Sequence, residues 1–279
     1  MKFPYNKTDS EMEFLSSKDA LFHFTKKDTA IENILNDRTL RFGTLSGTND
    51  PQEYKQKLTG AIGWGWEDRH NDKVSEVTNL IDGFLRKETK FISFCQSSFV
   101  DNKLSTHGLL KSRMWSQYGD NHRGICIVIS KSKFLKQLKD QYRRTHVLKS
   151  SNVAYEEPSL ESNIPCLDVD APVLDESKSR DIALSFIKEF SQSLLFTKQP
   201  DYKDENEFRV VAINIEKIDD SEFIYIDLNT CIHSIILGDA FPYVYKPTIQ
   251  KLAKELNVPC KKLHWEHHAY VLLNWSKES

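Results

Sequence analysis

The chain has 279 residues, of which 39% are hydrophobic, 11% are aromatic and 28% are charged, and its formal net charge is −2. This balance excludes a disordered chain, because 16 Phe, 10 Tyr and 5 Trp supply enough apolar area for a core. A charge so close to neutral also excludes binding of nucleic acid through a global positive field, although a local basic patch stays open.

The sequence shows no sign of export or of a membrane anchor. Residues 1–10 lack the apolar stretch of a signal peptide, and the apolar runs elsewhere are too short to span a bilayer. The cysteines are scattered without a CxxC pair, which is typical of reduced thiols. We therefore expect a cytoplasmic protein with free thiols at Cys95, Cys126, Cys166, Cys231 and Cys260.

Short strands and capped helices alternate in the first half of the chain. Thr29 and Glu32 match a capping box that opens a helix, and Asp50 followed by Pro51 matches a second helix start. The segment 124–130 (GICIVIS) is the clearest buried strand. The other elements expected here are strands at 21–25, 40–44 and 91–95, a short helix within 109–118 and a helix over 133–142.

The second half predicts further strands, helices and one long loop. Apolar residues recur every fourth position over 181–195, which predicts a helix. Prolines and acidic residues over 156–178 predict a surface loop. We also expect strands at 152–155, 207–213, 223–228 and 233–237, a helix over 247–256 and final strands at 263 and 270–273.

The order of these elements predicts the fold class. Steady βαβ alternation is missing, which favours an α+β fold with a mixed or split central sheet and flanking helices. We expect a single domain over 1–279, with an N-terminal extension at 1–20.

The standard nucleotide-binding, hydrolase and metalloprotease motifs are missing, so the chemistry must come from less regular segments. His23 and Thr25 share one face of the first strand. His23 either bonds a ligand hydroxyl or is satisfied at the strand end. Asn49, Asp50 and Glu53 either cap the next helix or leave side chains at a pocket rim.

Two later segments combine aromatic or charged side chains at regular spacing. Trp115 and Tyr118, close to Arg113, would share a helical face and either stack on a nucleobase or nicotinamide ring or pack in the core.

Glu205, Glu207 and Arg209 alternate along one strand face. Such a set can raise one carboxyl pKa or grip a ribose diol, or can be an ion pair on a solvated edge strand.

A histidine-rich segment near the C-terminus raises the question of a metal site. The spacing of His264, His267 and His268 matches no standard zinc pattern, and no cysteine lies near them. We interpret them as surface histidines and expect no metal.

Taken in order, several segments resemble a widespread bacterial family known as domain of unknown function 2971. The resemblance covers about 21–259 and implies no activity by itself, although it suggests a bacterial defence or toxin context. It rests on LFHFT at 21–25, NDPQE at 49–53, SF at 93–94, MWSQY at 114–118, RGICI at 123–127, VAY at 153–155, ENEFR at 205–209 and SIILGDAF at 234–241.

The layout is also similar to that of the ADP-ribosyltransferase superfamily, whose catalytic triad sits on three separated strands. This resemblance implies that His23 binds the NAD ribose, that Ser93 supports the nicotinamide ribose, and that Glu207 drives catalysis. Trp115 or Tyr118 would then flank the nicotinamide. The chain departs from the superfamily pattern at 93–95, where it reads Ser-Phe-Cys and the superfamily often has Ser-Thr-Ser.

The resemblance implies an enzyme that cleaves the nicotinamide–ribose bond of NAD and passes ADP-ribose to an acceptor, which could be protein, nucleic acid or water. One alternative is a nuclease or hydrolase that uses Glu205, Glu207 and His23, which would need Mg²⁺ and a third acidic ligand. Another is a non-enzymatic sensor or interaction domain.

Overall fold

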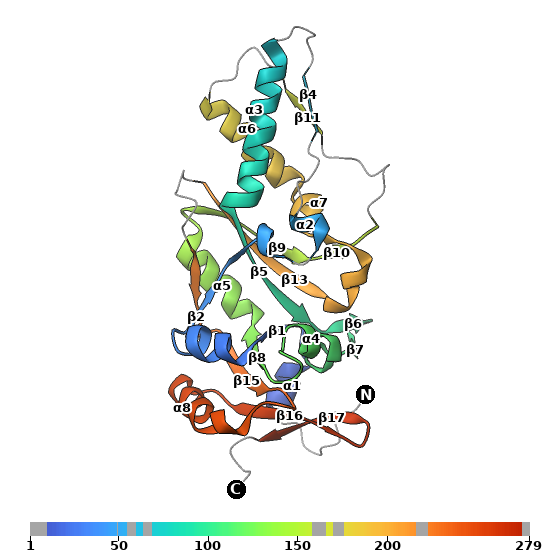
Figure 1. Cartoon of the computed structure of the whole chain (residues 1–279), viewed down its shortest axis with the longest axis vertical. Helices are drawn as coiled ribbons and strands as arrows, with labels where there is room; N and C mark the ends of the chain where they lie inside the picture. The colour runs from blue at the N-terminus through green and yellow to red at the C-terminus, as the bar shows by residue number, and fades with distance from the viewer. Residues whose placement is uncertain are drawn as a thin grey trace.

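The computed structural model of the chain describes residues 10–48, 50–54, 60–63, 69–157, 166–169, 176–215 and 223–274. Its centre is a nine-stranded sheet in the order β17-β16-β15-β8-β1-β5-β13-β9, with β3 paired to β5 beside this path (Figure 1). β15 and β16 run parallel, and the other neighbours run antiparallel. The predicted α+β class with a mixed central sheet is confirmed.

The strands of this sheet are formed by β-branched and aromatic runs, as their composition predicts. Every residue of β8 and of β13 is buried, so both strands are covered on both faces. The alternative of a solvated edge strand at 207–213 is therefore wrong. The strands are β1 (Ala20–Thr25), β3 (Gly43–Thr44), β5 (Thr89–Gln96), β8 (Ile125–Ser130), β9 (His146–Asn152), β13 (Glu207–Asn214), β15 (Ile232–Leu237), β16 (Cys260–Glu266) and β17 (Ala269–Asn274).

Four two-stranded sheets and a set of helices surround the central sheet. The small sheets pair β2 (Thr39–Arg41) with β14 (Tyr225–Asp227), β4 (Gly60–Gly63) with β11 (Cys166–Val169), β6 (Ser98–Val100) with β7 (Lys103–Thr106), and β10 (Ala154–Tyr155) with β12 (Thr197–Lys198). The α-helices are α1 (Ser10–Leu15), α2 (Pro51–Tyr54), α3 (Arg69–Gly83), α4 (Ser112–Gln117), α5 (Lys131–Tyr142), α6 (Glu176–Glu189), α7 (Ser191–Leu195) and α8 (Lys246–Leu256). Shorter turns are the π-helices η1 (Thr29–Leu35) and η3 (Phe84–Glu88) and the 3₁₀ segments η2 (Leu45–Gly47), η4 (Gly108–Leu110), η6 (Pro200–Glu205) and η7 (Tyr243–Tyr245).

Helices cover both faces of the sheet. On one face, Phe134 of α5 and Ile249 of α8 pack with Ile127 of β8. On the other, α6 and α3 cover the far end of β13, and α4 brings Trp115 against β1. Figure 1 shows α3 and α6 side by side above the sheet, and α8 with β16 and β17 at the opposite end. The site described below lies between these two ends.

Several local predictions need correction. The expected helix over 181–195 is two helices, which meet at Phe190. Part of the expected loop at 156–178 forms β11. The helix expected at Thr29 is a π-helix preceded by Asp28, whose side chain makes no capping hydrogen bond. The expected N-terminal extension contains α1, whose Leu15 is fully buried.

The thiols of Cys95, Cys126 and Cys231 are free and buried, and Cys260 is partly exposed; nothing is described for the side chain of Cys166. Among the described residues, no helix is both long enough and apolar enough to cross a membrane.

Candidate functional site

Strands β1 and β5 separate after a short pairing, and a pocket lies along the edge exposed there. In the described register, β1 pairs with residues 95–96 of β5, whereas β3 pairs with residues 90–91 of the same strand. The stretch 92–94 of β5 falls between these pairings and borders the pocket. The sheet is therefore split at the place where the sequence puts its candidate residues.

The pocket has a volume of about 280 Å³ and a mixed lining. Its apolar wall comes from aromatic side chains on β1 and β5 together with one methionine from α4, so a flat ring can pack there. Its polar lining comes from β1, β2, β3, β5, β12 and β13 and from the turns beside them. The residues are Phe22, Phe24, Phe91, Ile92, Phe94, Cys95 and Met114 on the apolar side and His23, Arg41, Gly43, Gly47, Thr48, Ser93, Tyr118, Lys198, Glu205 and Glu207 on the polar side.

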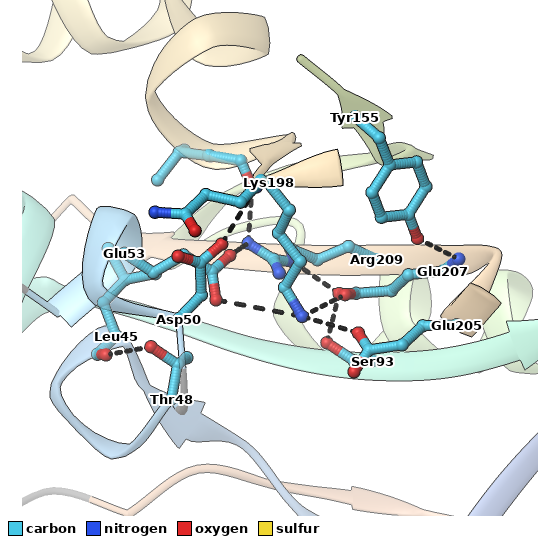
Figure 2. Close-up of polar contacts among 12 residues, drawn as sticks. Leu45, Thr48, Asp50, Glu53, Ser93, Tyr155, Lys198, Glu205, Glu207 and Arg209 are labelled. Atoms are coloured by element: carbon cyan, nitrogen blue, oxygen red, sulfur yellow. Dashed lines mark hydrogen bonds and ion pairs between the residues drawn. The ribbon is translucent and has the colours of Figure 1, made fainter. Parts of the chain in front are cut away.

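A cluster of five buried charged side chains, called the charged cluster below, stands beside this pocket (Figure 2). Arg209 donates from Nε to Oε1 of Glu207 at 2.6 Å, and its Nη1 lies 2.5 Å from Oε1 of Glu53. The Nζ of Lys198 lies 2.8 Å from one oxygen each of Glu205 and Glu207, and 3.9 Å from Glu53. Three carboxylates thus share two cations.

The chain brings these residues together by a turn immediately before β13. Asn206 adopts a left-handed conformation with φ of 43° between η6 and β13. Its side-chain amide donates to the carbonyl of Gln96 at 2.8 Å and to Ser98 at 3.1 Å, which fixes the turn against β5. Glu205 therefore ends a 3₁₀ segment and does not extend the strand, yet both Glu205 and Glu207 reach the pocket.

The cluster keeps Glu207 ionised. Burial alone would raise the pKa of Glu207, but the charges of Arg209 and Lys198 outweigh it and lower this pKa to about 2. For Glu53 the balance is reversed, because burial outweighs the same two cations and raises its pKa. Glu207 is therefore the carboxylate held as an anion at the pocket wall.

Hydroxyl groups complete the surroundings of the two pocket glutamates. Ser93 donates to Oε1 of Glu207, and Tyr118 donates to Oε1 of Glu205 at 2.6 Å. Burial and the nearby Glu205 raise the pKa of Tyr118, so its hydroxyl stays a neutral donor. The Tyr155 hydroxyl accepts from the backbone N–H of Glu207 at 2.8 Å (Figure 2).

His23 reaches the pocket from the opposite face of the sheet. Registers place Phe22 beside Cys95 and Cys95 beside Glu207, so these three side chains share a face. His23 lies on the other face, where its ring meets Phe94 edge to face at 5.9 Å. The ring also bonds to the backbone of Ser93, across the gap where the strands separate. Burial lowers the pKa of His23 to about 4, so the ring is neutral near pH 7.

Other residues expected at the site lie elsewhere. Trp115 is fully buried, with its indole N–H donating to the carbonyl of Leu109 at 2.7 Å, so it is a core residue. Arg113 joins α4 to η6 through the carbonyl of Asp201 at 2.7 Å. Thr25 is buried and does not line the pocket.

The candidate residues at the helix start, 49–53, have different contacts. Asp50 is buried, and its carboxylate accepts from the N–H of Gln199 at 3.1 Å. Glu53 enters the charged cluster through Arg209. Asn49 lies outside the described residues.

Sequence reasoning missed the central cation, Lys198. A lysine two residues after the apolar run 194–196 is a usable signal, because a charge beside such a run needs a partner if it is buried. Tyr155, Arg41 and Thr48 were also missed. Their positions depend on contacts between distant segments, which local patterns do not reveal.

The arrangement combines an anionic carboxylate, neutral hydroxyl donors, a neutral imidazole and an apolar wall. Such a pocket can hold a flat ring and stabilise a positive charge that develops next to Glu207. Within the described residues, no group of three His, Cys, Asp or Glu side chains has the geometry of a metal site.

Comparison with known proteins gives one match. No curated protein and no solved structure matches the chain. A family model described as "Protein of unknown function (DUF2971)" matches residues 114–210, a narrower span than the 21–259 expected from the sequence. This span contains most of α4, all of β8, Lys198, Glu205 at the end of η6 and the start of β13 with Glu207. The predicted resemblance to this family of proteins of unknown function is thereby confirmed over residues 114–210.

Proposed function

We propose that the pocket binds the nicotinamide–ribose end of NAD and that the protein cleaves the bond between them, with Glu207 as the catalytic carboxylate. The observation that carries this proposal is a carboxylate kept ionised at the wall of a pocket in a split sheet.

The charge of Glu207 suits the transition state of this reaction. Departure of nicotinamide leaves an oxocarbenium-like ribose, which a nearby carboxylate stabilises. Arg209 and Lys198 keep Glu207 ionised, and the Ser93 hydroxyl fixes one of its oxygens. Across the cluster, three carboxylates face two cations, so a cationic ligand would not meet an excess of positive charge.

The size and lining of the pocket fit one half of the dinucleotide. A volume of about 280 Å³ lies just below the usual range of ligand pockets, roughly 300–1,000 Å³. The aromatic wall suits the nicotinamide ring, and His23 and Tyr118 offer hydrogen bonds to the ribose and the carboxamide. Arg41, which is exposed at the pocket, suits the phosphates of a dinucleotide that continues outward.

The reaction balances without any further reagent. The bond from the ribose C1′ to the nicotinamide nitrogen breaks, and its electron pair leaves with nicotinamide, which becomes neutral. Water or another acceptor then adds to C1′ and loses a proton. With water the products are nicotinamide and ADP-ribose.

The position of Lys198 disfavours the metal-dependent alternative. Its Nζ contacts Glu205 and Glu207 at 2.8 Å and lies 3.9 Å from Glu53. An ammonium group therefore occupies the place between the carboxylates that a divalent ion would need. For a nuclease or hydrolase that uses Mg²⁺ at these glutamates, Lys198 would have to move away.

Nicotinamide release from NAD, with and without cell lysate as a source of acceptor, tests the proposal. Glu207→Gln keeps the shape and removes the charge, so we expect release to fall by about 10²–10³-fold. Glu205→Gln should have a milder effect, because Glu205 bonds Tyr118 and Lys198 beside the reacting centre. The matched control is Glu255→Gln, an exposed glutamate on α8, which should keep full activity.

Because Glu207 is buried in an ion-pair cluster, the folding of Glu207→Gln is measured separately from its activity. Ser93→Ala removes one hydrogen bond to Glu207 and leaves the charges, and we expect a loss of roughly tenfold. Absence of nicotinamide release from the wild-type protein would contradict the enzyme. Equal losses in Glu205→Gln and Glu207→Gln, together with inhibition by a chelator, would favour the carboxylate hydrolase instead.

A further inference from the structure

Helix α5 and the residues after it concentrate positive charge in a chain whose net charge is −2. Residues 131–144 contain six lysines and arginines and one acidic residue, Asp140. Phe134 and Leu138 turn one side of the helix into the core, so the charges gather on the other side. Lys136, Lys139 and Arg143 are exposed. Among the described residues, none of these three has an ion pair with an acidic side chain.

These three cations line a groove between α5 and the sheet-edge strand β9. The groove has a volume of about 660 Å³ and is lined by Ser132, Leu135, Lys136, Lys139, Asp140, Arg143, His146 and Leu148. Lys136, Lys139 and Arg143 are separated by three and four positions, so they follow one side of the helix over about 10 Å. This forms a row of point charges above a partly apolar floor.

A second cavity lies beside the first residue of α5, Lys131, and the last residue of β9, Asn152. It measures about 410 Å³ and contains Lys18 and Lys131, with no acidic residue in its lining. Its remaining lining supplies amide and hydroxyl groups and the ring of Phe99, over which Lys18 stands at 5.5 Å. Those residues are Ser17, Ala20, Gln96, Ser97, Ser98, Asn152 and Asn206.

We propose that these two cavities form a binding surface for single-stranded nucleic acid, with the phosphates along α5 and a base at Phe99. The two linings contain five lysines and arginines and one acidic residue, Asp140, and Asp19 lies outside them near Lys131. This excess of positive charge makes the surface complementary to a polyanion. The surface is separate from the pocket beside the charged cluster, and it does not depend on the reaction proposed there.

Two observations favour a nucleic acid over an acidic protein segment. The cations form a row along a groove, as in surfaces that follow a phosphate backbone. The second cavity adds an aromatic ring beside a lysine and a set of amide and hydroxyl groups, which suits a base next to its phosphate. An acidic peptide would use the charges and leave the ring and the amides without a role.

The second cavity also touches the turn that builds the candidate site. Asn206, which lines this cavity, stands between Glu205 and Glu207 and bonds to the carbonyl of Gln96. A strand bound at Lys18 and Lys131 would therefore end beside the segment that carries the pocket glutamates. This places a bound nucleic acid close to the pocket.

Fluorescence anisotropy with a labelled single-stranded oligonucleotide of about 12 nucleotides tests the surface, without NAD. We expect a Kd on the order of 1–100 µM at physiological salt, falling as salt is lowered. The triple variant Lys136→Gln, Lys139→Gln, Arg143→Gln should bind at least tenfold more weakly. It should also reduce the slope of log K against log salt by about 2, because three phosphate contacts are removed.

The matched control is Arg123→Gln, Lys251→Gln, Lys254→Gln, which removes the same charges from exposed positions outside the groove. It should bind as the wild type does. Failure of the wild type to bind, or equal binding by the two triple variants, would overturn the proposal. So would a polyglutamate of equal charge that competes as well as unlabelled oligonucleotide, which would indicate an acidic protein partner. Glu207→Gln should leave this binding unchanged, so the result is independent of the enzymatic proposal.

Discussion

Lys198 is the residue on which the charged cluster depends most directly. Its Nζ contacts Glu205 and Glu207 and lies near Glu53, and its side chain is almost completely buried. The neighbouring carboxylates raise its pKa against the effect of burial, so it stays charged. A buried charge that loses its partner is costly, because neither water nor an opposite charge replaces the lost contact.

Replacing Lys198 by Met should therefore destabilise the fold. Three carboxylates would then share Arg209 alone, and we expect a loss of about 3–5 kcal/mol in the free energy of unfolding, measured in urea at neutral pH. Lys251→Met, on the exposed side of α8, should change it by less than about 0.5 kcal/mol. A similar cost for both variants would mean that Lys198 does not hold the carboxylates as its contacts indicate.

The spacing of the two aromatic candidates predicted that they lie together, but the structure places them in different surroundings. Trp115 and Tyr118 lie three residues apart, which would place them on one helical face. However, α4 ends at Gln117, and Tyr118 follows as the residue that closes the helix. Trp115 packs into the core against Phe24, with ring centroids 5.0 Å apart, whereas Tyr118 lines the pocket. Helical periodicity cannot place a side chain beyond the end of the helix.

At the level of elements, the split between β1 and β5 decides which predicted residues meet. The sequence predicted β1, β5 and β13 as strands, and the structure confirms all three. Which faces align depends on register, and register depends on pairing between distant segments. His23 consequently lies on the face opposite to Glu207, and reaches the same pocket because the strands part between them. Strand identity was predictable, and the split was not.

The end of β1 beside the pocket is held by a close backbone approach at Gly124. A Cβ at this position would meet the carbonyl oxygens of Thr25 and Gly119 well inside van der Waals distance. Both are backbone atoms, so the strand and the turn would have to separate. We expect Gly124→Ala to cost roughly 1–3 kcal/mol of stability and to weaken any ligand bound beside Phe24.

Gly83→Ala is the matched control, since nothing lies within 4 Å of a Cβ at that position in the last turn of α3. It should be neutral or stabilising by up to about 1 kcal/mol, because Ala favours helix more than Gly does. Thermal melts of both variants, read beside ligand titrations, separate the two effects. If Gly124→Ala and Gly83→Ala have the same melting temperature, the backbone contact at Gly124 is looser than the structure indicates.

The whole molecule has a net charge near zero, but its charges gather in a buried cluster of both signs and in an exposed basic groove. The charged cluster buries three carboxylates and two cations, whereas the groove along α5 leaves its lysines and arginine exposed. Composition showed the near neutrality, and the order of the predicted elements indicated the α+β fold with a mixed sheet. Neither could predict the groove, because the groove needs α5 to lie along β9, or the pairing of β4 with β11, whose strands are about a hundred residues apart in sequence.

Stability of the whole molecule should fall on mild acidification because two histidines are buried in the neutral form. Burial lowers the pKa of both His23 and His107 from 6.5 to about 4. Between these values the unfolded chain binds protons that the folded chain does not. The contribution of the two histidines to the free energy of unfolding is therefore fully present above pH 6.5 and is lost as the pH falls towards 4. Each histidine should remove about 3 kcal/mol over this range, since one pKa unit corresponds to about 1.4 kcal/mol.

His107→Asn isolates one of these contributions. The His107 ring accepts from the N–H of Leu109 at 3.2 Å, and an Asn side chain can supply a similar acceptor without titrating. Urea unfolding between pH 7 and about 4 should show a loss of stability smaller by about 3 kcal/mol in this variant than in the wild type. His267→Asn, at an exposed position with φ of 46° that Asn tolerates, should follow the wild-type profile. Parallel profiles for wild type and His107→Asn would show that the folded protein accepts a proton at His107 as readily as the unfolded chain does.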